Sequence, residues 1–124
     1  MRVFVSAVGV SAMLLLSAAA ASAEDSIDSY CATMGEQDHF ASDGYPLKDA
    51  AQIIRQDRAN YHAFHNRDSD DDSDGTFGSK ASRARIEQMV RRGGMGREVR
   101  SEIVNGNPYI CVDVYSNSIE VLIQ

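Results

Sequence analysis

Two cysteines, Cys31 and Cys111, limit the folds open to this chain, because they are its whole complement and stand about 80 residues apart. If both are oxidised, only one pairing exists, and the fold must place residue 31 beside residue 111. Closing a loop of about 80 residues stabilises a folded state by about 4 to 5 kcal/mol on the chain-entropy model. The alternative is a reactive thiol, but neither cysteine lies beside a histidine or a basic cluster in the sequence. We therefore predict a disulfide between Cys31 and Cys111.

The first residues of the chain indicate an oxidising destination. Arg2 is the only early charge, residues 3–16 are apolar, and Ala21-Ser22-Ala23 comes directly before Glu24. This is the layout of a secretory signal. An apolar stretch of about 14 residues is shorter than the roughly 20 that a spanning helix needs, which disfavours the alternative of a retained membrane anchor. We predict a signal peptide over residues 1–23 and export to the bacterial periplasm or the medium, where disulfides form.

The remaining residues, 24–124, are expected to form a single small acidic domain. The whole chain carries a net charge of −6, and residues 1–23 contain one arginine and no acid, so the exported part has a net charge near −7. Residues 24–74 hold 13 acids and 4 bases, whereas residues 75–100 hold 7 bases and 2 acids. The charge separation predicts a dipolar molecule. The acidity, together with the lack of aromatic residues among the arginines, argues against nucleic-acid binding.

The pattern of apolar residues changes from a helical period to a period of two along the chain. It predicts helices over residues 26–34 and 46–65, and a third that is capped by Ser79 or Ser82 and ended by left-handed backbone at Gly93-Gly94. Strands are predicted at residues 97–104, 109–115 and 119–123, with a hairpin signal at Asn105-Gly106-Asn107-Pro108. The fold class is therefore α+β: two or three helices followed by a three-stranded antiparallel meander, with one disulfide.

Alternation in the middle predicted strand divides its residues between two faces of the sheet. Ile110, Val112 and Val114 share one face, which we predict to be the core, and the other face carries Tyr109, Cys111, Asp113 and Tyr115. A disulfide from Cys111 would draw the first predicted helix across that second face. Both faces of the sheet are therefore expected to be partly covered.

The sharpest local motif is an acidic segment between two predicted helices. Asp70, Asp72, Asp74, Gly75 and Phe77 resemble the first eight positions of an EF-hand calcium loop, with oxygen ligands at alternate positions and a glycine at the turn. The twelfth position, a bidentate glutamate in that family, is Ala81. The resemblance therefore implies at most a weak calcium site, through Asp70, Asp72 and Asp74. The alternative is a flexible, solvated loop.

Histidines supply the other candidate chemistry. His62 and His65 stand three residues apart on a predicted helix, so they could share a face and act as metal ligands or as acid–base groups with Asp57 or Asp68. No third metal ligand follows from the spacing, and the sequence contains no nucleophile motif such as Gly-x-Ser-x-Gly. A small hydrolase that uses His62 or His65 remains an alternative, without any predicted catalytic residue beyond them.

Without a convincing active site, binding is the function class that the sequence favours. We predict an exported, non-enzymatic protein-binding module, such as a periplasmic inhibitor or an immunity-type protein, that acts against a basic partner. The analogy rests only on the small size, the predicted export and the single disulfide, because exported proteins of this kind often neutralise another protein. The residues expected to meet the partner are Asp68, Asp70, Asp71, Asp72 and Asp74.

Overall fold

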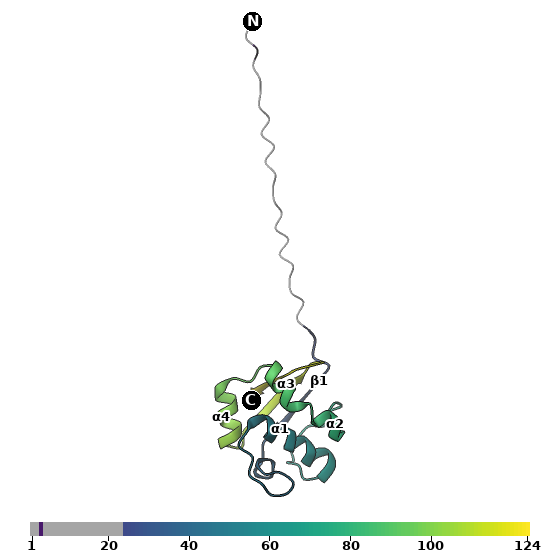
Figure 1. Cartoon of the computed structure of the whole chain (residues 1–124), viewed down its shortest axis with the longest axis vertical. Helices are drawn as coiled ribbons and strands as arrows, with labels where there is room; N and C mark the ends of the chain where they lie inside the picture. Colours follow the sequence, from purple (N-terminus) through teal and green to yellow (C-terminus); the bar gives the residue numbers. More distant parts are fainter. Residues whose placement is uncertain (1–2, 4–23) are drawn as a thin grey trace.

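One sheet and a layer of helices form the part of the chain that the structure, a computed structural model, describes: residue 3 and residues 24–124 (Figure 1). The predicted signal peptide, apart from residue 3, lies outside the described residues. Within those residues, no helix combines the length and the apolar character needed to cross a bilayer. In chain order the elements are strand β1 (Asp28–Thr33), 3-10 helix η1 (Glu36–His39), helix α1 (Ala50–Ala59), π-helix η2 (Asn60–Phe64), helices α2 (Lys80–Arg83), α3 (Ile86–Arg92) and α4 (Arg97–Asn105), and strands β2 (Tyr109–Val114) and β3 (Ile119–Ile123).

The three strands form an antiparallel sheet in the order β1-β2-β3. The predicted α+β class, with a three-stranded antiparallel meander and one disulfide, is confirmed. Cys31 of β1 stands directly opposite Cys111 of β2 and is bonded to it. The sheet therefore joins the first described element of the chain to the last two.

The prediction of a helix over residues 26–34 is wrong, because this segment forms β1. The helical interpretation needed Ile27 on a buried face, yet Ile27 is 65% exposed. Burial instead alternates, with Tyr30 and Ala32 inside and Cys31 and Thr33 half-buried on the opposite face. A segment with a period of two can be mistaken for a helix when apolar residues also fall three or four positions apart.

The prediction of a strand over residues 97–104 is also wrong, because these residues form α4. Ile103 is fully buried, and Val99, one helical turn earlier, packs against the core. The charged residues between them face solvent. The helix begins after Gly96, and the backbone N–H of Gly106 caps it by donating to the carbonyl of Glu102.

The two other predicted helices are confirmed with different bounds. The helix predicted over residues 46–65 begins at Ala50, because the Asp49 carboxylate accepts hydrogen bonds from the backbone N–H groups of Ala51 and Gln52. It continues through η2. The helix predicted after Ser79 is interrupted near Ala84 and so forms α2 and α3, with Ser79 as the cap of α2.

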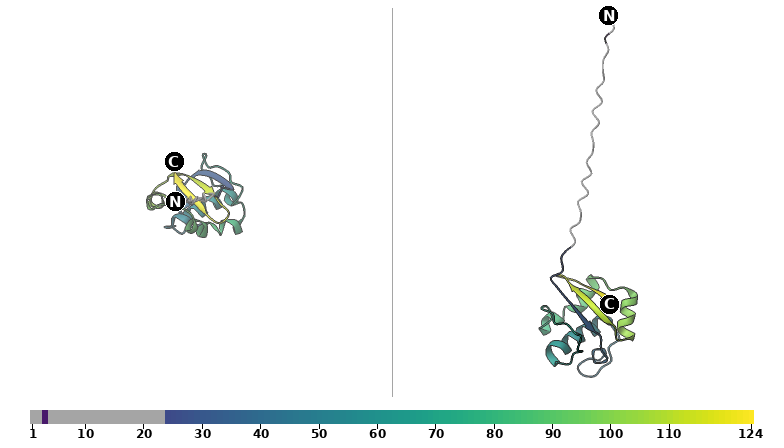
Figure 2. Two further views of the ribbon diagram at one scale, coloured as in Figure 1. Left: turned by 90° about the horizontal axis from the view of Figure 1, so that it is seen from above. Right: turned by 180° about the vertical axis from the view of Figure 1, so that it is seen from behind.

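The helices cover one face of the sheet only (Figure 2). The predicted inward residues Ile110, Val112 and Val114 are fully buried, which confirms that face as the core. The opposite side of the sheet, called the outer face below, bears the disulfide. The prediction that the disulfide draws a helix across this side is wrong, since the bond joins neighbouring strands. The outward-pointing residues are Ser29, Cys31, Thr33, Tyr109, Cys111, Asp113, Tyr115, Glu120 and Leu122.

Two glycines bring the end of α3 against β3. The N–H of Gly94 donates to the carbonyl of Ile119, and the N–H of Val121 donates to the carbonyl of Gly94. A Cβ atom on Gly93 would overlap the carbonyl oxygen of Ile119. The predicted left-handed backbone at Gly93 is wrong, because its φ is −97°. Glycine is required there by close backbone approach, and the contact covers part of the β3 edge.

Candidate functional site

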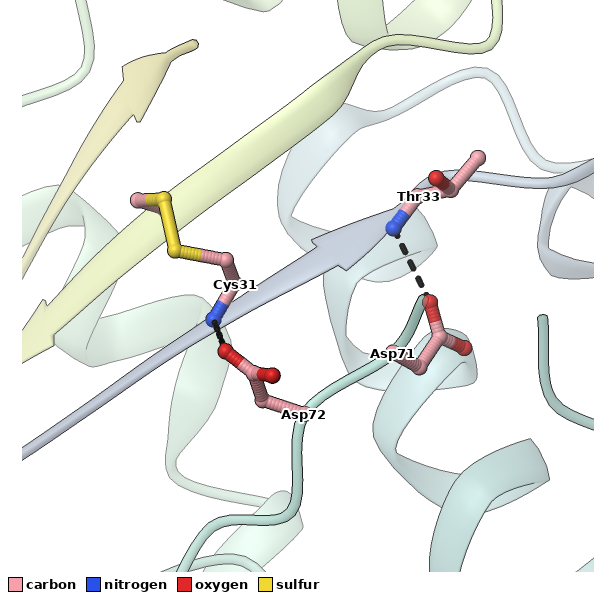
Figure 3. The surroundings of a disulfide bond; sticks show 5 residues. Cys31, Thr33, Asp71 and Asp72 are labelled. Atoms are coloured by element: carbon pink, nitrogen blue, oxygen red, sulfur yellow. Dashed lines mark hydrogen bonds between the residues drawn. A yellow bond between two sulfur atoms is a disulfide. The ribbon is translucent and has the colours of Figure 1, made fainter. Parts of the chain in front are cut away.

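Residues 68–74, the acidic loop, lie along the free edge of β1. The Asp72 carboxylate accepts a hydrogen bond from the N–H of Cys31 at 3.0 Å, and Asp71 accepts one from the N–H of Thr33 at 2.9 Å (Figure 3). The backbone N–H of Asp72 donates to the carbonyl of Cys31 at 2.8 Å. The loop is thus hydrogen-bonded along this edge, where a fourth strand would pair, while its residues 69, 70, 72 and 73 are exposed to solvent.

Aspartate side chains accept hydrogen bonds from the backbone N–H groups of β1 that point away from β2. Asp28 accepts the N–H of Ser29, and its other oxygen accepts from the N–H of Gly75 and the hydroxyl of Thr76. An edge strand with unpaired backbone groups is a template for aggregation. The carboxylates fill these positions and place negative charge where another strand would otherwise pair.

The residues predicted to meet a partner differ in their exposure. Asp70 and Asp72 are exposed, and Asp70 accepts a hydrogen bond from the Thr33 hydroxyl at 2.8 Å. Asp71 and Asp68 are half-buried, and the side-chain amide of Gln37 donates to Asp68 at 2.9 Å. Asp70 and Asp72 are therefore the most accessible carboxylates of the loop.

Asp74, the last residue of the loop, is buried against Arg58. Nη1 of Arg58 lies 2.8 Å from Asp74 Oδ1, and Nε of the same side chain lies 2.7 Å from Asp57 Oδ2. The guanidinium is also stacked on the ring of Tyr30, 4.0 Å from its centroid, and lies 4.8 Å from that of Tyr61. Asp74 therefore fixes the end of the loop in the interior of the protein.

Hydrogen bonds determine the protonation state of Asp74. Burial by itself raises the pKa of this carboxyl, but hydrogen bonds from the Phe77 N–H, His62 and Arg58 lower the pKa below its ordinary value. The carboxylate thus keeps its negative charge beside the buried Arg58. Its contacts leave it directed inward, away from any partner on the surface.

The three predicted calcium ligands contact separate groups. Asp70 meets Thr33, Asp72 meets Cys31, and Asp74 meets Arg58. Within residues 24–124, no three histidine, cysteine or acidic side chains are grouped so that they could hold a metal ion. Calcium binding through these aspartates stays a prediction.

The π-helical turn η2 separates the two predicted histidines. His62 is directed inward, and its Nε2 lies 2.7 Å from Asp74 Oδ1. His65 is exposed and ends the turn with a left-handed backbone, at φ 53°. The structure pairs His62 with Asp74, in place of the predicted Asp57 or Asp68. The hydrolase hypothesis stays a prediction.

The outer face of the sheet is a second acidic surface, which the sequence analysis missed. Asp113 of β2 and Glu120 of β3 are direct cross-strand partners on this face. Tyr115 lies beside them, and its hydroxyl is 3.5 Å from Glu120 Oε2. Burial raises the pKa of Tyr115, and the negative charges of Glu120 and Asp113 raise it further. No lysine or arginine occurs in any of the three strands.

Tyr109 connects this surface to the acidic loop. It stands opposite Thr33, the residue that contacts both Asp70 and Asp71. Burial raises the pKa of Tyr109, and the charges of Asp72 and Asp70 add to that effect. Loop and sheet thus form one continuous acidic surface with two tyrosines, which we call the acidic face: Asp70, Asp72, Tyr109, Asp113, Tyr115 and Glu120.

Two further carboxyls lie inside the protein, behind the loop. Asp38 accepts hydrogen bonds from the Gly35 N–H at 2.9 Å and from the side-chain amide of Asn60 at 2.8 Å. Burial nevertheless raises the pKa of Asp38 to about 6. Burial also raises the pKa of Asp57, against the effect of Arg58. The folded state therefore binds protons more readily than the unfolded chain in mildly acidic solution.

The raised pKa of Asp38 predicts greater stability at pH 5 than at pH 7. Folding takes up a proton between the ordinary pKa of 3.8 and the folded value of about 6, so stability rises as the pH falls through this window. We expect Asp38 alone to add about 1 kcal/mol to the free energy of unfolding at pH 5 relative to pH 7. Urea unfolding at both pH values measures the difference.

Asp38→Asn removes this titrating group and should reduce the pH difference by the same amount. The exposed neighbour Glu36, changed to Gln, is the matched control and should leave the difference as in the original protein. An unaltered pH difference in Asp38→Asn would show that the proton is taken up elsewhere.

The chain matches no protein-family model, no curated protein and no solved structure. Its function must therefore be argued from its own residues.

Proposed function

We propose that this chain is an exported, non-enzymatic module that binds a basic protein partner through the acidic face, in the manner of a periplasmic inhibitor or an immunity protein. The observation that carries the proposal is the direct pairing of Asp113 with Glu120. Like charges opposite each other on neighbouring strands destabilise a sheet. A basic group supplied by a partner would relieve that repulsion. The relief would contribute to the free energy of binding.

The acidic face is held in place at two points. In its middle, the disulfide joins β1 to β2. At its edge, the carboxylates of Asp71 and Asp72 fix the loop to the backbone of β1. A surface that is already ordered loses little conformational entropy when a partner binds, which favours affinity.

The charge distribution supports recognition of a basic partner. Apart from Arg67, which directly precedes the acidic loop, the exposed arginines lie in α3, α4 and the turn before α3, in the helix layer behind the sheet. The outer face and the acidic loop therefore present negative charge without a neutralising base in the strands. Complementary charge accelerates encounter and does so most strongly at low ionic strength. Export, which the leader and the disulfide support, places that encounter outside the cytoplasm.

The double variant Asp113→Asn/Glu120→Gln tests the proposal. Immobilised protein is exposed to periplasmic extract at low salt, and each retained basic protein is then purified and titrated against the variants. We expect a partner to bind the original protein and to bind the double variant at least about tenfold more weakly. The same variant should unfold at slightly higher urea, because its sheet no longer carries the repulsion.

The matched control is Glu98→Gln/Glu102→Gln, which removes the same charge from exposed positions of α4. It should retain the partner with unchanged affinity. The proposal fails if no basic protein is retained at low salt, or if both double variants weaken binding equally.

A further inference from the structure

A groove of about 610 Å³ lies on the helical side of the molecule, between the α1–η2 segment and α2. This volume is within the range of small-ligand sites, roughly 300 to 1,000 Å³. Its apolar wall includes Leu47, Ala59, Ala63 and Phe64. None of the residues of the acidic face lines it, so the groove is a separate surface.

The irregular turn η2 explains why an apolar wall is open to solvent. The N–H of His65 donates to the carbonyl of Asn60, five residues earlier, which widens the helix. Ala63 and Phe64 are thereby exposed at the groove, and Phe64 is 57% exposed. Turns of this kind occur frequently at functional sites.

Three cations and one acid also line the groove: Arg55 of α1, Lys80 and Arg83 of α2, and Glu87 of α3. Arg55 contacts Glu87 at 3.4 Å, which leaves Lys80 and Arg83 as positive charge without a counter-ion among residues 24–124. Arg83 is only 8% exposed. Its Nη1 donates to the carbonyls of Phe77 and Gly78, while its Nε and Nη2 have no hydrogen-bond partner within the described chain.

Lys80 and the unused, solvent-accessible donors of Arg83 suit an anion, because charge-assisted hydrogen bonds to a guanidinium are strong. The apolar residues that also line the groove suit an aliphatic group that displaces water from them. A molecule with an anionic head and an aliphatic tail matches both parts of the lining. We propose that the groove binds a single-chain aliphatic carboxylate, with its head at Lys80 and Arg83 and its chain along Ala59, Ala63 and Phe64.

Calorimetric titration of the purified protein with decanoate, below its micelle concentration, tests the inference. We expect saturable binding at one site. Decanol has the same chain without the charge, and decyltrimethylammonium carries the opposite charge. Both should bind at least about tenfold more weakly than decanoate. Equal affinity for decanol, or heat without saturation, would overturn the proposal.

Variants locate the site. Lys80→Glu reverses an exposed charge at the groove and should weaken decanoate binding by about tenfold. Ala63→Trp should abolish binding by filling the space beside Phe64. Arg97→Glu, the control, makes the same change of charge on α4, which contributes nothing to the groove, and should bind as the original protein does. Equal loss in Lys80→Glu and Arg97→Glu would refute the site, and circular dichroism confirms that each variant is folded.

Discussion

Replacement of Arg58 by methionine is expected to lower the free energy of unfolding by about 3 to 5 kcal/mol, because it leaves two buried carboxylates without their cation. Asp57 and Asp74 both contact this guanidinium, and the side chains of all three are at most 1% exposed. The change also removes the stacking on Tyr30 and Tyr61. Since small domains are stable by only about 5 to 15 kcal/mol, the variant should be partly unfolded near 37 °C. Urea denaturation followed by circular dichroism measures the loss.

Two further variants separate charge from packing. Arg92→Met, at an exposed position of α3, should change stability by less than about 0.5 kcal/mol. Combining Arg58→Met with Asp74→Asn removes one of the stranded carboxylates, so the pair should lose less than the sum of the two single changes. A loss of under about 1 kcal/mol in Arg58→Met alone would mean that the buried charges are neutralised in another way.

Removal of the disulfide by Cys31→Ser/Cys111→Ser should cost about 2 to 5 kcal/mol. The bond closes a loop with a sequence separation of 80 residues, and it lies on the uncovered face of the sheet. Both positions are half-buried, so the serine hydroxyls retain access to water and add little penalty of their own. The measured loss should therefore report the cross-link. Thermal unfolding in the presence and absence of a reductant provides the comparison.

Reductant should lower the midpoint of the original protein towards that of the double serine variant and should leave the variant itself unchanged. If reductant has no effect on the original protein, the two cysteines are not bonded under those conditions. If the serine variant is as stable as the original, the sheet register alone holds β1 against β2.

The sequence was sufficient for the parts of the fold in which one periodicity dominates. Alternation in β2 placed Ile110, Val112 and Val114 in the core, and the serine before α2 marked its start. The two segments that were assigned the wrong type of element, β1 and α4, are short, and their few apolar residues fit both periods. For α4, the decisive fact is that Val99 and Ile103 pack against the same core, a tertiary property that a local pattern does not contain.

The candidate site could be predicted only in part, for a related reason. The sequence showed that the aspartates are numerous. Their partners, however, are backbone N–H groups about 40 residues earlier in the chain. Because nearly every residue has such a group, the residue types do not show which one an aspartate contacts. The pairing of Asp113 with Glu120 depends on the strand register, which a hairpin of the right length sets. The groove depends on the π-helical turn η2, and no pattern in residues 60–64 predicts such a turn.

The position of β1 at one end of the described chain and of β2 near the other has a consequence for the order of folding. Pairing of Cys31 with Cys111 brings together residues that are separated by most of the domain, and contacts of such long range form slowly. Until residues 109–114 have been made, β1 has no neighbouring strand. The sheet can therefore be completed only when nearly the whole domain has been synthesised.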